Sequence, residues 1–174
     1  MVKPRARGES HLYFAYGSNL FVPQMASLAP DAVPVGLARL EGHELFLNVH
    51  GVLSVRSNVD TTVLGLLWSC TDADLKSLDR FEAVDAGLYV REVFSVETIG
   101  ELSDHETVDS FVYRSVSTQT GKPRPGYLEI AVLSAMRTLG FPPAYVALVE
   151  GFLNNGTAGD PWQSVPASDA VFTT

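Results

Sequence analysis

Six consecutive positions near the middle of the chain, Val63–Trp68, carry only apolar residues and one glycine. A strand that is apolar on both faces has to be covered on both faces, so this run predicts a central strand of a sheet. Other strand-like segments surround it, and we expect residues 57–60, rich in turn-forming side chains, to separate two of them. Including the central run, these segments are residues 11–16, 33–49, 52–56, 61–70, 88–98 and 108–116.

Helical patterns interrupt this series of strands only rarely. Thr71 is followed by two early acids, which is typical of a helix N-terminus, and Leu75, Leu78 and Phe81 then recur at helical spacing. The strands lack the regular helical crossovers of a doubly wound fold. We therefore expect an α+β fold around a mainly antiparallel sheet or barrel of six or seven strands. The predicted helices are residues 20–28, 71–81, 126–139 and 142–154.

Composition and charge exclude several classes of protein. Of 174 residues, 46% are hydrophobic and 18% charged, which favours a globular domain over a disordered chain. The net charge of -8 argues against nucleic acid or an anionic membrane surface as a partner. A single cysteine, Cys70, allows no internal disulfide and indicates a reducing, cytoplasmic compartment. Because Cys70 stands at the end of an apolar strand, we interpret it as a small core residue.

The chain reads as one domain with short flanking segments. The basic start is not followed by an apolar stretch, so it does not resemble a signal peptide, and no apolar run is long enough to span a membrane. We expect residues 1–10 to be a disordered lead-in, residues 11–155 to be the folded domain and residues 156–174 to be a C-terminal tail.

The turn Tyr16–Leu20 lies between a predicted strand and a predicted helix. Glycine allows the backbone to approach a ligand closely, and amides at the start of a helix can hold a carboxylate or a developing oxyanion. The same residues also suit an ordinary strand-to-helix turn with an asparagine cap. The local pattern leaves both interpretations open.

Glu82 stands at the end of the predicted helix 71–81, with apolar residues on both sides. A partly desolvated carboxyl there would have a raised pKa, as a proton shuttle at neutral pH requires. The alternative is a solvated glutamate in a helix-to-strand turn. Asp79 is a candidate second carboxylate, or it pairs with a neighbour such as Arg80.

Other candidate residues are weaker. Tyr89, Tyr113 and Tyr127 stand near the ends of three elements, where they could line a pocket or belong to a half-buried core. Ser18 with His50 could be a nucleophile and its base, although nothing nearby completes a triad. The four histidines are scattered without ligand spacing, so we expect no metal site.

Taken together, two segments resemble the γ-glutamylcyclotransferase family. Residues 12–20 (LYFAYGSNL) are similar to its opening signature, and residues 75–91 (LKSLDRFEAVDAGLYVR) are similar to the segment with its catalytic glutamate. The turn at His50, the strand Val63–Trp68 and the residues before Tyr127 follow in the matching order. The resemblance covers about residues 11–155, and it is specific because two motifs occur at the right separation.

The resemblance implies a small mixed barrel flanked by helices, with no metal and no cofactor. It implies Glu82 as the general acid/base, and one departure is Ala83, where many members have glycine. Asn19 favours the branch acting on γ-glutamyl amino acids or amines over those acting on γ-glutamyl-ε-lysine or glutathione. The implied substrate-binding residues are Tyr13, Tyr16, Gly17, Ser18, Asn19, Tyr89, Tyr113 and Tyr127.

We therefore expect an enzyme of the lyase or acyltransferase type, connected to glutathione metabolism, that releases 5-oxoproline and a free amine. Its ligand would be a small γ-glutamyl molecule, and the protein would act as a monomer or homodimer. Two alternatives remain open at this point. The chain could remove a γ-glutamyl group from a biosynthetic intermediate, or it could be a non-catalytic module that binds a small molecule.

Overall fold

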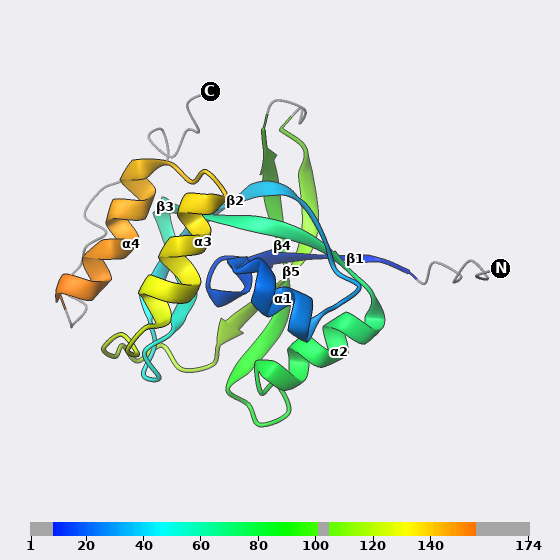
Figure 1. The fold of residues 1–174 in the computed structure, drawn as a ribbon, viewed down its shortest axis with the longest axis horizontal. Helices are drawn as coiled ribbons and strands as arrows, with labels where there is room; N and C mark the ends of the chain where they lie inside the picture. Colours follow the sequence, from blue (N-terminus) through cyan, green and yellow to red (C-terminus); the bar gives the residue numbers. More distant parts are fainter. Residues whose placement is uncertain (1–8, 101–104, 156–174) are drawn as a thin grey trace.

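Five strands close into a barrel in the order β1-β3-β2-β4-β5 (Figure 1). The structure is a computed structural model that describes residues 9–100 and 105–155. Nearly all of the predicted lead-in and the whole predicted tail, residues 156–174, lie outside these residues. The strands are β1 (His11–Ala15), β2 (Val33–Leu47), β3 (Leu53–Cys70), β4 (Tyr89–Ile99) and β5 (Thr107–Ser115).

Every neighbouring pair of strands is antiparallel except β1 and β5, which run parallel where they close the barrel. The predicted fold, a mixed and mainly antiparallel barrel with flanking helices, is confirmed. β3 lies between β1 and β2, and all six residues of Val63–Trp68 are buried, as a central strand requires. Cys70 at its end is buried as well, and burial raises the pKa of its thiol to about 12.

The predicted number of strands was wrong, because two predicted segments, residues 52–56 and 61–70, form the single long strand β3. The chain stays extended through residues 57–60, where a turn was expected. The register between the two strands shifts there, because Glu41 pairs with Thr62 and His43 with Ser57, so residues 58–61 of β3 lie opposite Gly42 alone. Asn58 makes a local contact, since its Oδ1 accepts from the Asp60 amide at 3.2 Å, and its Nδ2 donates across the pair to Glu44 Oε2 at 2.8 Å.

The helices cover the outside of the barrel as two groups (Figure 1). α1 packs with α2, while α3 and α4 both pack with η2. Among the described residues no helix combines the length and the apolar character needed to cross a membrane. The helices are η1 (Ser18–Leu20), α1 (Val22–Leu28), α2 (Asp72–Phe81), η2 (Tyr127–Leu133), α3 (Ser134–Thr138) and α4 (Pro143–Asn155).

α2 carries the clearest local signal. Thr71 and Asp74 form a capping box, in which the Thr71 Oγ1 accepts from the Asp74 amide at 3.2 Å and the Asp74 carboxylate accepts from the Thr71 amide at 2.9 Å. Leu75 and Leu78 face the core as predicted, but Phe81 does not, since 47% of its surface is exposed. The cap and the two leucines therefore fix where α2 begins and how it lies on the barrel, which sets the position of its C-terminal end.

Candidate active site

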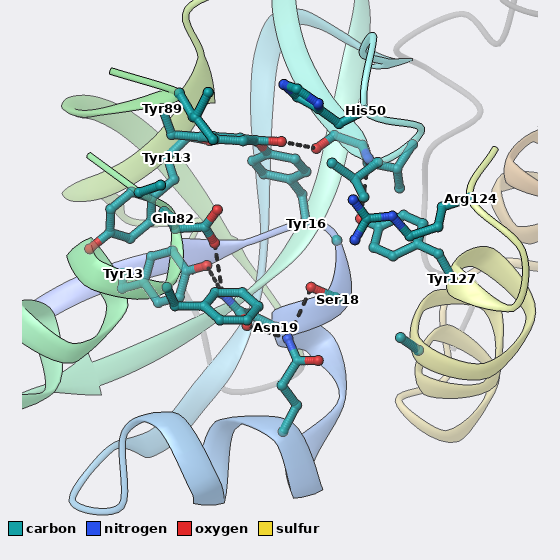
Figure 2. Close-up of a pocket in the computed structure, with 18 residues that line it drawn as sticks. Tyr13, Tyr16, Ser18, Asn19, His50, Glu82, Tyr89, Tyr113, Arg124 and Tyr127 are labelled. Carbon is teal, nitrogen blue, oxygen red and sulfur yellow. Dashed lines mark hydrogen bonds between the residues drawn. The ribbon is translucent and has the colours of Figure 1, made fainter. Parts of the chain in front are cut away.

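A cavity of about 380 Å³ opens where the β1–η1 turn, the C-terminal end of α2 and the start of η2 meet (Figure 2). All nine residues predicted to form the site line it, although they come from five separate parts of the chain. They are Tyr13, Tyr16, Gly17, Ser18, Asn19, Glu82, Tyr89, Tyr113 and Tyr127.

The turn after β1 is a single 3-10 turn, closed by the Leu20 amide donating to the Gly17 carbonyl at 3.0 Å. Gly17 is required here by close approach, because a Cβ at this position would lie 2.9 Å from the Tyr127 hydroxyl oxygen. Asn19 is buried, so its side chain points into the protein and not along the surface. The turn is therefore part of the cavity wall.

Asn19 is held by a residue that sequence reasoning missed. Gln24 Nε2, one turn further along in α1, donates to Asn19 Oδ1 at 2.8 Å and to Ser18 Oγ at 3.0 Å. With its oxygen occupied, Asn19 directs its Nδ2 to the Tyr13 hydroxyl at 2.8 Å and to Glu82 Oε1 at 3.3 Å. The sequence signal for Gln24 was weak, since a glutamine on a short surface helix has no characteristic pattern.

Glu82 caps the C-terminal end of α2, and its amide donates to the Leu78 carbonyl at 2.8 Å. Burial raises the pKa of its carboxyl from 4.5 to about 7, and the hydrogen bond from Asn19 opposes part of this rise. No cation forms an ion pair with it in residues 9–100 and 105–155. The cavity therefore contains one carboxyl group that can gain and lose a proton near neutral pH.

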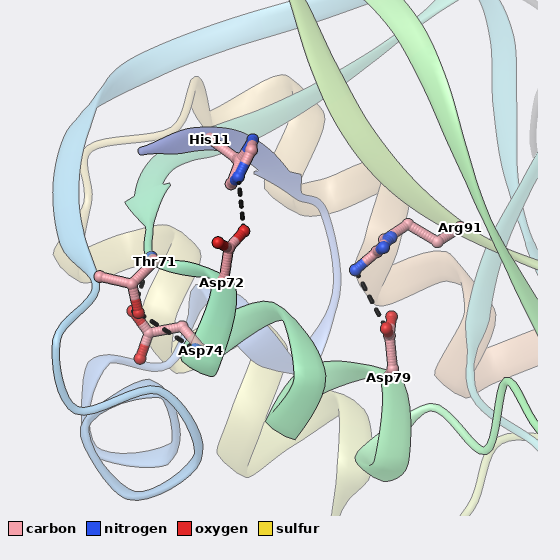
Figure 3. Close-up of polar contacts among 6 residues, drawn as sticks. All are labelled: His11, Thr71, Asp72, Asp74, Asp79 and Arg91. Carbon is pink, nitrogen blue, oxygen red and sulfur yellow. Dashed lines mark hydrogen bonds and ion pairs between the residues drawn. The ribbon is translucent and has the colours of Figure 1, made fainter. Parts of the chain in front are cut away.

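Asp79, the other predicted carboxylate, does not line this cavity. Its Oδ1 accepts from the Tyr113 hydroxyl at 2.7 Å, and its Oδ2 pairs with Arg91 Nη1 at 3.0 Å (Figure 3). The Tyr113 carbonyl in turn accepts from the Tyr16 hydroxyl. Asp79 thus supports two tyrosines of the cavity wall from behind. Its predicted pairing is observed, but the partner is Arg91 and not Arg80.

The five cavity tyrosines divide into two groups by their hydrogen bonds. Tyr16, Tyr89 and Tyr113 each donate their hydroxyl proton to a carbonyl or carboxylate of the protein. Tyr13 and Tyr127 instead accept, from Asn19 Nδ2 at 2.8 Å and from the Leu53 amide at 3.2 Å. Within the described residues neither of these two donates a hydrogen bond. Their hydroxyl protons are therefore available to a ligand.

Ser18 and His50 both line the cavity, but they do not form the nucleophile and base considered above. In the described part of the chain no hydrogen bond joins them, and Ser18 Oγ accepts from Gln24 instead. Within residues 9–100 and 105–155, no group of three or more histidine, cysteine or acidic side chains is placed so that it could hold a metal ion.

Arg124 is a second cavity residue that sequence reasoning missed. It lies between Pro123 and Pro125, a segment whose sequence indicated only a rigid connector. Its place in the wall depends on packing against the turn at Gly51, more than seventy residues earlier, with the Arg124 amide donating to the Gly51 carbonyl at 2.9 Å. A contact between residues so far apart in the chain cannot be predicted from the local sequence pattern.

Within the described residues, the barrel thus has a cavity whose single carboxyl group is not paired with a cation. The family described as gamma-glutamyl cyclotransferase, AIG2-like, matches residues 13–129. A gamma-glutamylcyclotransferase from Bos taurus is 30% identical over 148 residues, which are 79% of this chain and 76% of the relative. The Homo sapiens protein of the same name is 29% identical over 161 residues, 87% of this chain and 83% of its own length.

A solved structure described as a gamma-glutamyl cyclotransferase superposes with a TM-score of 0.73 at 26% identity, over 82% of this chain and 87% of that one. The chain therefore belongs to the gamma-glutamyl cyclotransferase family. It is an enzyme of this type.

Ala83 departs from the glycine expected at this position, and the structure gives that departure a physical meaning. Its φ is 51°, in the left-handed region that glycine occupies without penalty. The Val84 amide donates to the Asp79 carbonyl at 3.0 Å and the Ala83 amide to the Arg80 carbonyl at 3.2 Å. These are the two bonds of a Schellman motif, in which glycine is the usual residue. The C-terminal end of α2, which carries Glu82, therefore forms this motif with alanine in place of glycine.

Proposed function

We propose that this chain converts a γ-glutamyl amino acid or amine to 5-oxoproline and the free amine, with Glu82 as general acid and base. The observation that carries the proposal is the Glu82 carboxyl itself, which is desolvated, unpaired with any described cation and fixed by Asn19 inside the cavity. A pKa of about 7 suits a group that both accepts and donates a proton at neutral pH.

The reaction moves two protons from the α-nitrogen of the substrate to the leaving nitrogen. The Glu82 carboxylate takes a proton from the substrate's α-ammonium group, and the freed amine attacks the γ-carbonyl carbon of the same molecule. A carbon–nitrogen bond forms, and the carbonyl oxygen becomes an oxyanion. When this intermediate collapses, the bond to the leaving nitrogen breaks as Glu82 gives the proton to that nitrogen. The ring nitrogen still holds two protons, and it loses one through Glu82 to the departing amine, so 5-oxoproline forms with one N–H and the amine leaves as an ammonium group. Because nucleophile and electrophile share one molecule, the enzyme mainly has to hold the glutamyl group curled.

The cavity wall supplies groups suited to that task. The turn Gly17–Asn19 would bind the glutamyl unit through its backbone, and the hydroxyl protons of Tyr13 and Tyr127 would be donated to its carboxylate or to the growing oxyanion. Tyr16, Tyr89 and Tyr113 would shape the cavity with their rings, because their hydroxyls are already bonded to the protein.

The setting we propose follows from the same chemistry. The ligand is a small γ-glutamyl molecule in a reducing, cytoplasmic compartment, and the reaction belongs to glutathione metabolism. The chain would need no cofactor, metal or nucleic acid for it, and would act as a monomer or homodimer.

The product distinguishes this reaction from hydrolysis. The enzyme is incubated with γ-glutamyl-alanine and with the N-acetyl derivative, and the products are identified by mass. We expect 5-oxoproline from the first compound and no reaction of the second, because acetylation removes the nucleophilic lone pair. Glutamate as the primary product, or N-acetylglutamate from the blocked compound, would contradict the proposal.

A further inference from the structure

Arg124 is the one arginine or lysine among the described residues that line the cavity, as Glu82 is the one carboxylate. Its side chain is exposed at the mouth. Within residues 9–100 and 105–155 its guanidinium forms neither an ion pair nor a side-chain hydrogen bond. The mechanism proposed above makes no use of this charge.

The backbone that carries Arg124 is held firmly. Prolines flank it on both sides, its amide donates to the Gly51 carbonyl at 2.9 Å, and its carbonyl accepts from the Tyr127 amide at 3.1 Å. A guanidinium on such a fixed segment loses less freedom on binding a ligand than one on a loose loop. It also presents a planar set of donors that matches a carboxylate.

The position of Arg124 separates it from the reacting groups. Figure 2 shows it beside Tyr127, across the cavity from Glu82. Burial raises the pKa of the Tyr89 and Tyr127 hydroxyls, and the Arg124 charge opposes this at both. The Glu82 carboxyl responds to burial and to Asn19, with no contribution from Arg124.

This separation decides which part of a substrate Arg124 can reach. The substrate's own α-carboxylate shares a carbon with the α-amine, and that amine has to be at Glu82, so this carboxylate stays at the inner end. The leaving group begins beyond the γ-carbonyl and extends toward the mouth. If the leaving group is an amino acid, it carries a second carboxylate two bonds from the departing nitrogen.

We propose that Arg124 binds the carboxylate of the leaving amino acid and thereby makes the enzyme selective for γ-glutamyl amino acids over γ-glutamyl amines and amides. This inference rests on the proposed cyclotransferase reaction. It assigns the leaving-group end of the cavity to one residue, whereas Glu82 and the Gly17–Asn19 turn serve the glutamyl end.

The test uses two substrates that differ only in that charge, γ-glutamyl-alanine and γ-glutamyl-alaninamide, and measures 5-oxoproline release. We expect the wild-type enzyme to favour the acid in kcat/KM by roughly 10- to 100-fold, the range of a charge-assisted hydrogen bond, mainly through KM. Arg124→Gln should lose this preference, because kcat/KM should fall for γ-glutamyl-alanine alone. Arg124→Glu should reverse the preference. Lys122→Gln removes an exposed charge two residues away that does not line the cavity, and it should leave the preference unchanged.

Two results would overturn the inference while leaving the proposed function intact. In one, wild-type enzyme releases 5-oxoproline from both compounds at equal kcat/KM. In the other, Arg124→Gln weakens both substrates equally, which would place Arg124 at the glutamyl end. Failure of the wild-type enzyme to form 5-oxoproline from any γ-glutamyl compound would overturn the proposed function, and this inference with it.

Discussion

Glu82 and Asp79 are three residues apart at the C-terminal end of α2, yet their carboxyl groups have opposite surroundings. Asp79 faces the back of the cavity wall and is bound by the Arg91 guanidinium and the Tyr113 hydroxyl. Glu82 faces the cavity and receives one hydrogen bond of 3.3 Å from a neutral amide. The same helix end thus presents one carboxylate that is neutralised and one that is not.

The difference shows how a fold separates a structural acid from a reactive one. A paired carboxylate stabilises the wall, because the Arg91 guanidinium and the Tyr113 hydroxyl are both bound to it. An unpaired, desolvated carboxylate destabilises the folded protein when ionised, and that same penalty makes it a base at neutral pH. Stability and reactivity should therefore respond oppositely to changes at these two positions.

The largest effect is expected from Glu82→Gln. The amide keeps the shape of the side chain but cannot shuttle a proton, so turnover should fall roughly 10²- to 10⁴-fold, or about 3–5 kcal/mol in barrier height. Circular dichroism should show an unchanged fold, and 5-oxoproline release gives the rate. Asp85→Asn is the matched control, because Asp85 is exposed in the following turn and does not line the cavity. A folded Glu82→Gln enzyme within a few-fold of wild type would remove Glu82 from the mechanism.

The next largest effect is on the stability of the folded protein and comes from a substitution of Asp79. Asp79→Ala leaves Arg91 unpaired and leaves the Tyr113 hydroxyl with the Leu75 carbonyl, at 3.4 Å, as its remaining acceptor, so the unfolding free energy should fall by about 2–3 kcal/mol. Turnover should fall less than tenfold or so, since only the wall behind the cavity is loosened. Asp79→Asn keeps an acceptor for Tyr113 and should recover part of the loss. An Asp79→Ala protein as stable as wild type would show that the pairing has no structural role.

The dependence of stability on pH tests the contrast between the two carboxyl groups, because the effect is expected to come from Glu82. Its pKa is raised from 4.5 to about 7 in the folded state, so the folded protein holds this proton more tightly than the unfolded chain. The associated stability is present below about pH 4.5 and is lost as the pH rises through about 7. Glu82→Gln should accordingly be more stable than wild type by about 2 kcal/mol near pH 8, with no such gain near pH 4.

Urea unfolding of both proteins across this range measures the difference. The gain cannot be a general effect of the substitution, because it is expected to disappear on the acid side. A difference that is constant with pH would mean that the Glu82 carboxyl is not titrating between the two states.

Sequence patterns predicted the parts of the molecule that local chemistry determines. The cap at Thr71 places α2, the apolar run places β3, and the position of Glu82 follows from where α2 ends. The turn at Gly17 was predicted as a binding loop, although its reason for being glycine is the nearby Tyr127 hydroxyl. That reason depends on a contact between residues 110 positions apart.

What could not be predicted depends on contacts of this long-range kind. The predicted strands 52–56 and 61–70 join into β3 across a shift of register against β2, where residues 58–61 lie opposite Gly42. Gln24 and Arg124 acquire their places in the cavity from packing, and neither stands in a pattern with a chemical meaning of its own. Phe81 has the spacing of a core residue, but it lines the cavity and 47% of it is exposed.

The smallest expected effect concerns Ala83, the residue that follows the two carboxylates. Ala83 holds the left-handed position of the Schellman motif that ends α2, with a φ of 51°. Ala83→Gly removes the strain of that Cβ and should raise the unfolding free energy by about 1 kcal/mol.

Gly87→Ala is the reverse experiment in the same turn, because Gly87 has a φ of 72° and a Cβ there would contact nothing within 4 Å. Gly87→Ala should lower the unfolding free energy by a similar amount, about 1 kcal/mol, because this substitution changes only the backbone strain.

Turnover of Ala83→Gly should stay within about twofold of wild type, because the backbone that positions Glu82 keeps its conformation. If Ala83→Gly instead lowers stability while Gly87→Ala behaves as expected, the Ala83 methyl group contributes packing at the cavity mouth that outweighs its strain. A loss of turnover without loss of stability would show that this methyl group restrains the direction of the Glu82 carboxyl, and would extend the contrast between the two acids to the residue that follows them.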